Sequence, residues 1–181
     1  MIRENIVSET AYVVSAARTP IGSFQGALAS MTAPQLGAHA IRGVLQDVND
    51  TQIDEVLIGN VISAGLKQAP ARQAMRIAGL PDSVAATTIN KVCGSGMKAT
   101  MIAADLIRSG SAGCVISGGM ESMTNSPYLL AGARSGMRMG HSETKDSMFL
   151  DGLEDAETGG SMGSFAQSTA DFHQLTRQAM D

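Results

Sequence analysis

The sequence contains few of the residues that hold small or metal-bound folds together. Its 181 residues include only two cysteines, Cys93 and Cys114, which are too few for a disulfide framework. No spacing of histidines and cysteines is typical of a zinc site, so we expect no metal. Aromatic residues make up only 3% of the chain, against twelve methionines, which indicates soft and adaptable apolar surfaces.

The sequence also has no large excess of charge of one sign and no long hydrophobic run. Thirteen basic and seventeen acidic residues give a net charge of −4, with no Lys/Arg cluster. This excludes nucleic acid and anionic membranes as expected partners. The longest uncharged stretch, residues 19–41, contains Pro20 and Pro34 and does not fit a membrane-spanning helix. The first residues lack the apolar core of a signal peptide, so we expect a cytoplasmic location.

What is present is the composition of a globular chain, with 44% hydrophobic and 17% charged residues. Strand-like and helix-like patterns alternate up to residue 118. Strands are predicted at residues 11–15, 56–61, 86–90 and 113–117, and helices at 33–48, 71–78 and 96–109. This βαβαβαβ order predicts an α/β fold with a largely parallel sheet. The third helix is apolar almost all round, so we expect it to be buried between two layers.

The alternation stops after Gly119. Residues 120–163 are rich in glycine, serine, methionine and charge, with little periodicity, and we interpret them as an inserted loop region. Near the C-terminus, Thr176 is typical of a helix N-cap, yet the sequence ends at Asp181 after about one turn. We therefore expect further chain downstream.

The candidate nucleophile is Cys93. It lies in the segment Asn-Lys-Val-Cys-Gly-Ser-Gly-Met, residues 90–97, between a predicted strand and a predicted helix. The N–H groups and dipole at a helix N-terminus favour a thiolate. The small residues let a thioester carbonyl approach, and the N–H of Cys93 would help to hold the oxyanion. Cys93 therefore suits covalent acyl transfer. The alternative is a buried structural cysteine, which is our interpretation of Cys114 in mid-strand.

A second interpretation uses the same residues. Residues 94–99 fit the G-x-G-x-x-A dinucleotide fingerprint, and Glu121 follows about 20 residues later. The fingerprint usually occupies the first strand–helix turn of its unit, whereas two strands precede it here, so this is a minor alternative. The three histidines are His39, His141 and His173. None lies in a context typical of a base for Cys93, and the base stays unassigned.

Several motifs together resemble those of one known family. They are V-S-A-A-R-T-P-I-G at 14–22, A-P-A-R-Q at 69–73, I-N-K-V-C-G-S-G-M-K-A at 89–99, G-G-M-E-S-M at 118–123, R-M-G at 138–140, D-G-L at 151–153 and M-G at 162–163. In this order, from Tyr12 to Asp181, they resemble the N-terminal part of a thiolase. Within the thiolase family the chain is most similar to the acetyl-CoA C-acetyltransferases.

The resemblance implies a layered fold of two similar α/β domains, with a loop domain inserted in the first that covers the substrate. Residues 1–121 would form most of the N-terminal domain, and residues 122–181 would begin the loop domain. The C-terminal thiolase domain would be absent from this chain. The resemblance also implies a homo-oligomer, dimer or tetramer, or association with a C-terminal thiolase half.

The resemblance further implies the chemistry. Cys93 matches the acyl-accepting cysteine, and Leu153 and Met162 match positions near the pantetheine and acyl part of coenzyme A. The implied reaction joins two acetyl-CoA into acetoacetyl-CoA and coenzyme A, or cleaves a 3-oxoacyl-CoA. No cofactor is implied beyond these coenzyme A thioester substrates.

The sequence also departs from the family pattern. The family's activating histidine, in a G-H-P motif, and its second cysteine, in C-x-G-G-G, do not occur in this sequence. Activity would then require the missing half. The alternative is a non-catalytic chain that binds acyl-CoA or a partner. Ser161 stands where short-chain members often carry histidine, which leaves the acyl-chain preference open.

Overall fold

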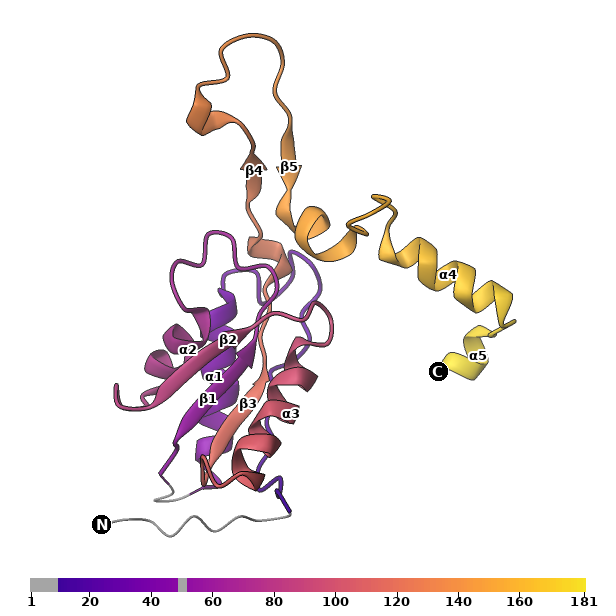
Figure 1. The fold of residues 1–181 in the computed structure, drawn as a ribbon. Coiled ribbons are helices and arrows are strands. Elements are labelled where there is room, and N and C mark those ends of the chain that lie inside the picture. The colour runs from indigo at the N-terminus through magenta and orange to yellow at the C-terminus, as the bar shows by residue number, and fades with distance from the viewer. Residues whose placement is uncertain (1–9, 49–51) are drawn as a thin grey trace. The chain divides into compact units, whose positions relative to one another are not determined.

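The structure is a computed structural model that describes residues 10–48 and 52–181. It divides into two compact units, one ending at Ser126 and one formed by Pro127–Asp181. The first unit contains the sheet and its three helices, and the second contains a hairpin and two further helices (Figure 1).

The first unit is built on a parallel sheet of three strands. These are β1 (Glu55–Gly59), β2 (Ala85–Ile89) and β3 (Val115–Gly119), in the order β2-β1-β3. At the end of β1, Gly59 lies opposite Ile89 on one side and Gly119 on the other. The carboxyl ends of all three strands therefore meet at one edge of the sheet.

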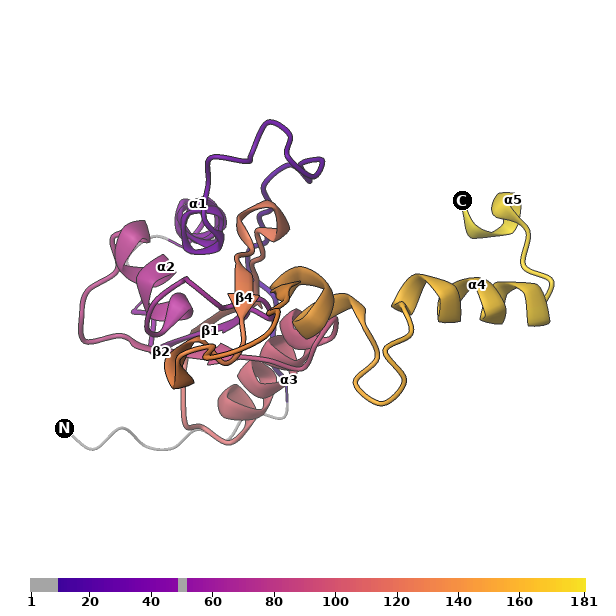
Figure 2. The ribbon, with the colours of Figure 1, turned by 90° about the horizontal axis from the view of Figure 1, so that it is seen from above.

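Helices cover both faces of this sheet. The helices α1 (Ala33–Leu45) and α2 (Pro70–Ala78) lie on one face, and α3 (Ser95–Arg108) lies on the other (Figures 1 and 2). Short helices alternate with parallel strands, as the sequence predicts, so the α/β fold class is confirmed.

The core follows from the alternation of side chains along β1. Val56 and Ile58 point into the cluster formed with α1 and α2, while Leu57 packs against Ala99 and Ala103 of α3. Leu57 is 2% exposed and Val56 is fully buried. This central strand is apolar on both faces because each face is covered by a helix.

One prediction about this unit is wrong. Residues 11–15 form no strand, and Tyr12 and Val13 are 77% and 83% exposed, because no described strand pairs with them. On α3, Met97 and Met101 on the side away from the sheet are 73% and 51% exposed, so burial of this helix between two layers stays a prediction. The sheet covers one side of α3, and no described element covers the other.

The second unit is more regular than the loop region that the sequence predicts. It contains an antiparallel hairpin and a turn of π-helix, followed by two α-helices. These elements are β4 (Tyr128–Leu130), β5 (Thr144–Asp146), η3 (Phe149–Leu153), α4 (Met162–Phe172) and α5 (Arg177–Met180). Short 3-10 turns occur at Met123–Asn125 and Ala133–Ser135. The predicted N-cap is confirmed, because the Thr176 side chain accepts from Ala179 N at 3.2 Å.

The assignment of residues 1–121 and 122–181 to a thiolase α/β domain and its loop domain stays a prediction.

Over the described ranges, no helix is both long enough and apolar enough to cross a lipid bilayer.

Candidate functional site

Cys93 lies between the end of β2 and the start of α3, in a segment that we call the Cys93 turn, residues 90–95. Its thiol is free and exposed. The alternative of a buried structural cysteine is therefore wrong for Cys93. The turn leads directly into α3, so Cys93 lies beside the N-terminal N–H groups of that helix.

The Cys93 turn is held by a buried serine. The Ser95 hydroxyl accepts from Lys91 N at 2.8 Å and donates to the Val92 carbonyl oxygen at 2.6 Å. Gly94 N donates to the carbonyl oxygen of Lys91 at 3.1 Å, which tightens the same loop. Ser95 is 4% exposed, so both of its bonds are shielded from water. These contacts fix the backbone on each side of Cys93.

The residue before Cys93 has an unusual backbone conformation. Val92 has a φ of +48°, in the left-handed region that β-branched residues rarely adopt. Its N–H donates to Asn90 Oδ1 at 3.0 Å. Strain of this kind costs on the order of 1–3 kcal/mol and persists only where the surroundings enforce it. The bonds from Asn90 and Ser95 enforce it here, and they present Cys93 outward.

Cys114 has a different environment, directly before β3. The Asp54 carboxylate accepts from Gly113 N at 2.7 Å and from Cys114 N at 3.1 Å. Burial, and to a lesser extent the Asp54 charge, raise the pKa of the Cys114 thiol above its ordinary value. A partly buried thiol that stays protonated is a poor nucleophile. This agrees with the structural role that the sequence indicates for Cys114.

Leu153 and Met162 both lie in the second unit, whereas Cys93 lies in the first. Leu153 ends η3, and Met162 begins α4. An antiparallel bridge between Glu154 and Ser161 brings these two positions to either end of one short loop. The Ser161 side chain also caps α4 by accepting from Ser164 N at 3.2 Å. Their role near coenzyme A stays a prediction.

No base for Cys93 is found among the described residues of the first unit. His39, on α1, is the one histidine of that unit. It lines a groove of about 360 Å³ with Arg18 and Pro20, and no hydrogen bond joins it to Cys93. Among residues 10–48 and 52–181, no group of three or more His, Cys, Asp or Glu side chains is arranged to hold a metal ion.

Glu121 has a role that the sequence did not indicate. Its carboxylate accepts hydrogen bonds from Asn60 Nδ2, from Val61 N and from Ile62 N. Burial raises the pKa of Glu121, and the two backbone N–H groups partly oppose this rise. The dinucleotide alternative needs this carboxylate for a ribose hydroxyl, but it is already occupied by the loop after β1.

The fold and the Cys93 turn together define an α/β domain with an exposed cysteine at the N-terminus of a helix. Residues 11–181 match the family described as the thiolase N-terminal domain. The chain belongs to the thiolase family, as the motifs indicate. This membership replaces the dinucleotide-binding alternative.

Curated relatives agree with this membership. The chain is 48% identical over 178 residues to the acetyl-CoA acetyltransferase of Schizosaccharomyces pombe, covering 97% of this chain and 45% of the relative. It is 49% identical over 171 residues to the acetyl-CoA acetyltransferase of Pseudomonas aeruginosa, covering 93% of this chain and 44% of the relative. The corresponding protein of Saccharomyces cerevisiae is 47% identical over 179 residues. The chain thus spans about half the length of these relatives.

Proposed function

We propose that this chain supplies the acyl-accepting part of an acyltransferase that forms or cleaves 3-oxoacyl-CoA. In the synthetic direction two acetyl-CoA give acetoacetyl-CoA and coenzyme A, through an acylated Cys93. The observation that carries the proposal is the exposed Cys93 thiol, held in a strained turn at the N-terminus of α3. The names of the relatives, acetyl-CoA acetyltransferase, support the acetyl group as the one transferred.

The chemistry follows from a thiolate in this position. The Cys93 sulfur attacks the thioester carbonyl of acetyl-CoA, the bond to the coenzyme A sulfur breaks, and coenzyme A leaves as the thiol after taking up a proton. A second acetyl-CoA loses a proton from its α-carbon, and the resulting enolate attacks the acetyl-Cys93 carbonyl. The carbon–sulfur bond to Cys93 then breaks, which releases acetoacetyl-CoA and restores the thiolate.

Substrate contacts in the proposal come from the second unit. Leu153 and Met162 contact the pantetheine and acyl part of coenzyme A, and the half-buried Leu153 and the 39% exposed Met162 suit an apolar arm. The reaction uses no cofactor beyond the coenzyme A thioesters. We place it in the cytoplasm, because both cysteines are free thiols.

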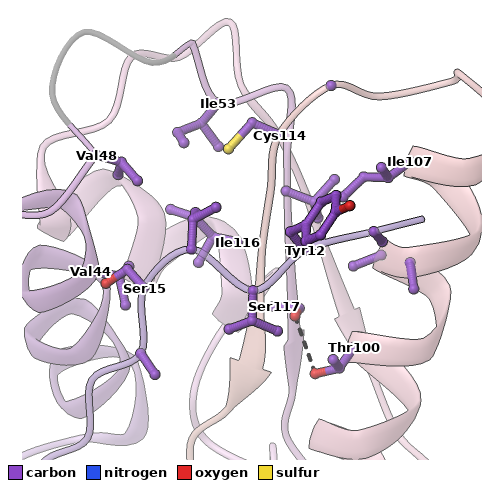
Figure 3. Close-up of a pocket in the computed structure, with 18 of the residues that line it drawn as sticks. Tyr12, Ser15, Val44, Val48, Ile53, Thr100, Ile107, Cys114, Ile116 and Ser117 are labelled. Carbon is purple, nitrogen blue, oxygen red and sulfur yellow. Dashed lines mark hydrogen bonds between the residues drawn. The ribbon is translucent and has the colours of Figure 1, made fainter. Parts of the chain in front are cut away.

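The proposal includes a C-terminal thiolase half as the partner that completes the enzyme. A groove of about 410 Å³ separates residues 11–17 from the outer side of β3, an edge strand of the described sheet (Figure 3). Apolar residues line it, including Val44, Ile107 and Ile116. Together with the exposed Met97 and Met101 on α3, this is apolar surface that a soluble protein covers.

In this proposal the C-terminal half covers both the groove beside β3 and the exposed side of α3. The length of the relatives that this chain does not span supplies the chain needed to cover them. The same half supplies the general acid–base group and second cysteine that this sequence lacks. The completed enzyme assembles further into a homo-oligomer, a dimer or a tetramer.

A second candidate function is a non-catalytic thiolase-like chain that binds acyl-CoA or a partner. The observation in its favour is that His39, the one histidine of the first unit, forms no hydrogen bond with Cys93. General acid–base catalysis at the α-carbon then has no histidine bonded to Cys93 among the described residues of that unit.

Complementation separates the two candidates. The chain is produced together with the C-terminal remainder of the Pseudomonas aeruginosa relative, and cleavage of acetoacetyl-CoA by coenzyme A is measured. We expect activity with the wild-type chain and with Cys114→Ser, and none with Cys93→Ser. Binding of acetyl-CoA without turnover, unchanged by Cys93→Ser, would favour the non-catalytic chain instead.

A further inference from the structure

Glu121 lies just beyond the end of β3, and its carboxylate is surrounded by N–H donors from the loop after β1. The Oε1 atom accepts from Asn60 Nδ2 at 2.7 Å and from Ile62 N at 3.1 Å. The Oε2 atom accepts from Val61 N at 2.9 Å. The ion pairs among the described residues do not include Glu121. The N–H groups of residues 60–62 therefore stabilise its negative charge.

The loop that Glu121 holds also contacts β2. Asn60 N donates to the carbonyl oxygen of Ile89, the last residue of β2, at 3.0 Å. On the other side, Met120 N donates to the carbonyl oxygen of Gly59 at 2.9 Å. The Cys93 turn begins at the residue after Ile89. A chain of hydrogen bonds thus runs from Glu121 through Asn60 to the start of that turn.

The Asn60 side chain is held through its amide nitrogen. It is 2% exposed, and its amide N–H groups donate to Glu121 and, at 3.3 Å, to the Met120 carbonyl oxygen. Its Oδ1 is buried without a hydrogen-bond partner among the residues that the structure describes. The bonds that its amide nitrogen donates therefore set the position of the Asn60 side chain. Of the two acceptors of these bonds, the Glu121 carboxylate is the stronger.

We propose that Glu121 is a positioning residue for Cys93. Its carboxylate fixes residues 60–62, these residues fix the end of β2, and the end of β2 fixes the Cys93 turn against α3. An effect of Glu121 on catalysis rests on the proposed function, in which Cys93 is the nucleophile. Its effect on the thiol can be measured without turnover.

The test compares two thiols of the same 181-residue chain. The variant is Glu121→Gln, with Glu143→Gln at an exposed position as the matched control. A glutamine has one acceptor oxygen, so its NH₂ group faces one of the donors of residues 60–62 and that contact is lost. The chain is treated with iodoacetamide at one pH, and alkylation of Cys93 and of Cys114 is followed by mass spectrometry of their peptides.

We expect Glu121→Gln to slow alkylation of Cys93 by about two- to fivefold, because the lost hydrogen bond lets the Cys93 turn depart from the conformation that presents the thiol. Cys114 is expected to react at its wild-type rate. Unchanged reactivity of Cys93 would overturn the proposal. Faster alkylation of the partly buried Cys114 would also overturn it, because general loosening of the fold would then explain the result.

A second variant keeps the proposal testable if Glu121→Gln does not fold. Glu121→Asp retains the carboxylate but shortens its reach, and we expect a Cys93 rate between those of the wild type and of Glu121→Gln. In the completed enzyme, Glu121→Asp should lower kcat by about tenfold or more while KM stays within about threefold. A change in KM alone would contradict positioning of Cys93. If the wild-type enzyme has no activity, the proposed function fails while the alkylation ratio still tests this inference.

Discussion

Gly59 lies directly against Ser95, at the point where the sheet supports the Cys93 turn. A Cβ atom on Gly59 would lie 2.6 Å from the Ser95 Cβ and 2.7 Å from the Gly96 N. Contacts this short do not occur in folded proteins, and the atoms on the other side belong largely to the backbone of α3. The missing side chain at the end of β1 therefore lets the N-terminus of α3 reach the sheet.

This contact predicts that Gly59→Ala displaces the start of α3. We expect a loss of roughly 1–3 kcal/mol in the free energy of unfolding, the usual cost of overpacking. Gly118→Ala is the matched control, because it also lies in a parallel strand and a Cβ there meets nothing within 4 Å. Urea unfolding of both variants measures the difference. Equal stability of the two variants would contradict the close contact.

Ser95→Ala tests whether the Ser95 hydroxyl supports the Cys93 turn. It removes the hydroxyl that accepts from Lys91 N and donates to the Val92 carbonyl oxygen. We expect a loss of about 1–3 kcal/mol in stability and slower alkylation of Cys93. Ser109→Ala, which removes an exposed hydroxyl bond to the Leu106 carbonyl oxygen, should change neither. A wild-type Cys93 rate in Ser95→Ala would show that the hydroxyl does not hold the turn.

The Cys114 thiol should titrate above pH 9. Burial raises its pKa above the ordinary value of 9.0, and Asp54 adds a smaller rise. The thiol then stays protonated in the folded chain while the unfolded chain loses its proton. Its contribution to stability is therefore complete below pH 9 and is lost as the pH rises from 9 through the folded-state pKa.

The measurement is the alkylation rate of Cys114 against pH, in buffer and in denaturant. The pH at the midpoint of this rate profile should be higher in buffer than in denaturant. Asp54→Asn should lower it only in part, because burial is the larger cause. Identical midpoints in the two conditions would contradict the burial of this thiol.

The exposed methionines of α3 should contribute to binding of the C-terminal half. Met101→Gln makes the uncovered side of α3 more polar, so we expect a more soluble chain that binds the C-terminal half more weakly. Burying one such side chain is worth about 1.5–3 kcal/mol, which corresponds to at least about tenfold in the dissociation constant. Met139→Gln is the control, since Met139 is 98% exposed and lies in the second unit.

Native mass spectrometry of the mixed halves measures this association. Equal dissociation constants for Met101→Gln and Met139→Gln would show that α3 is not the covered surface.

Much of the fold was predictable because local patterns determine it. The apolar run of β1 is covered on both faces, and the start of α5 is marked by Thr176, a capping residue that the sequence shows directly. The strand predicted at residues 11–15 failed for a different reason. Its apolar residues indicate a strand, but a strand forms only where a neighbour offers hydrogen bonds, and no described strand does so.

The candidate site was predictable only in part. Cys93 could be found because a cysteine followed by small residues at a strand–helix junction is a local pattern. The role of Glu121 depends on donors about sixty positions earlier in the chain, which only the fold brings to its carboxylate. The strain at Val92 left no signal either, since valine is a residue that rarely adopts a positive φ.

The most direct test of the central claim is to trap the acyl group. The chain and the C-terminal remainder of the Pseudomonas aeruginosa relative are mixed with acetoacetyl-CoA without free coenzyme A, quenched in acid and digested. Mass spectrometry should then find one acetyl group on the peptide that contains Cys93, and none in Cys93→Ser. Cleavage of acetoacetyl-CoA with no acetyl group on Cys93, or with the acetyl group on Cys114, would contradict the account.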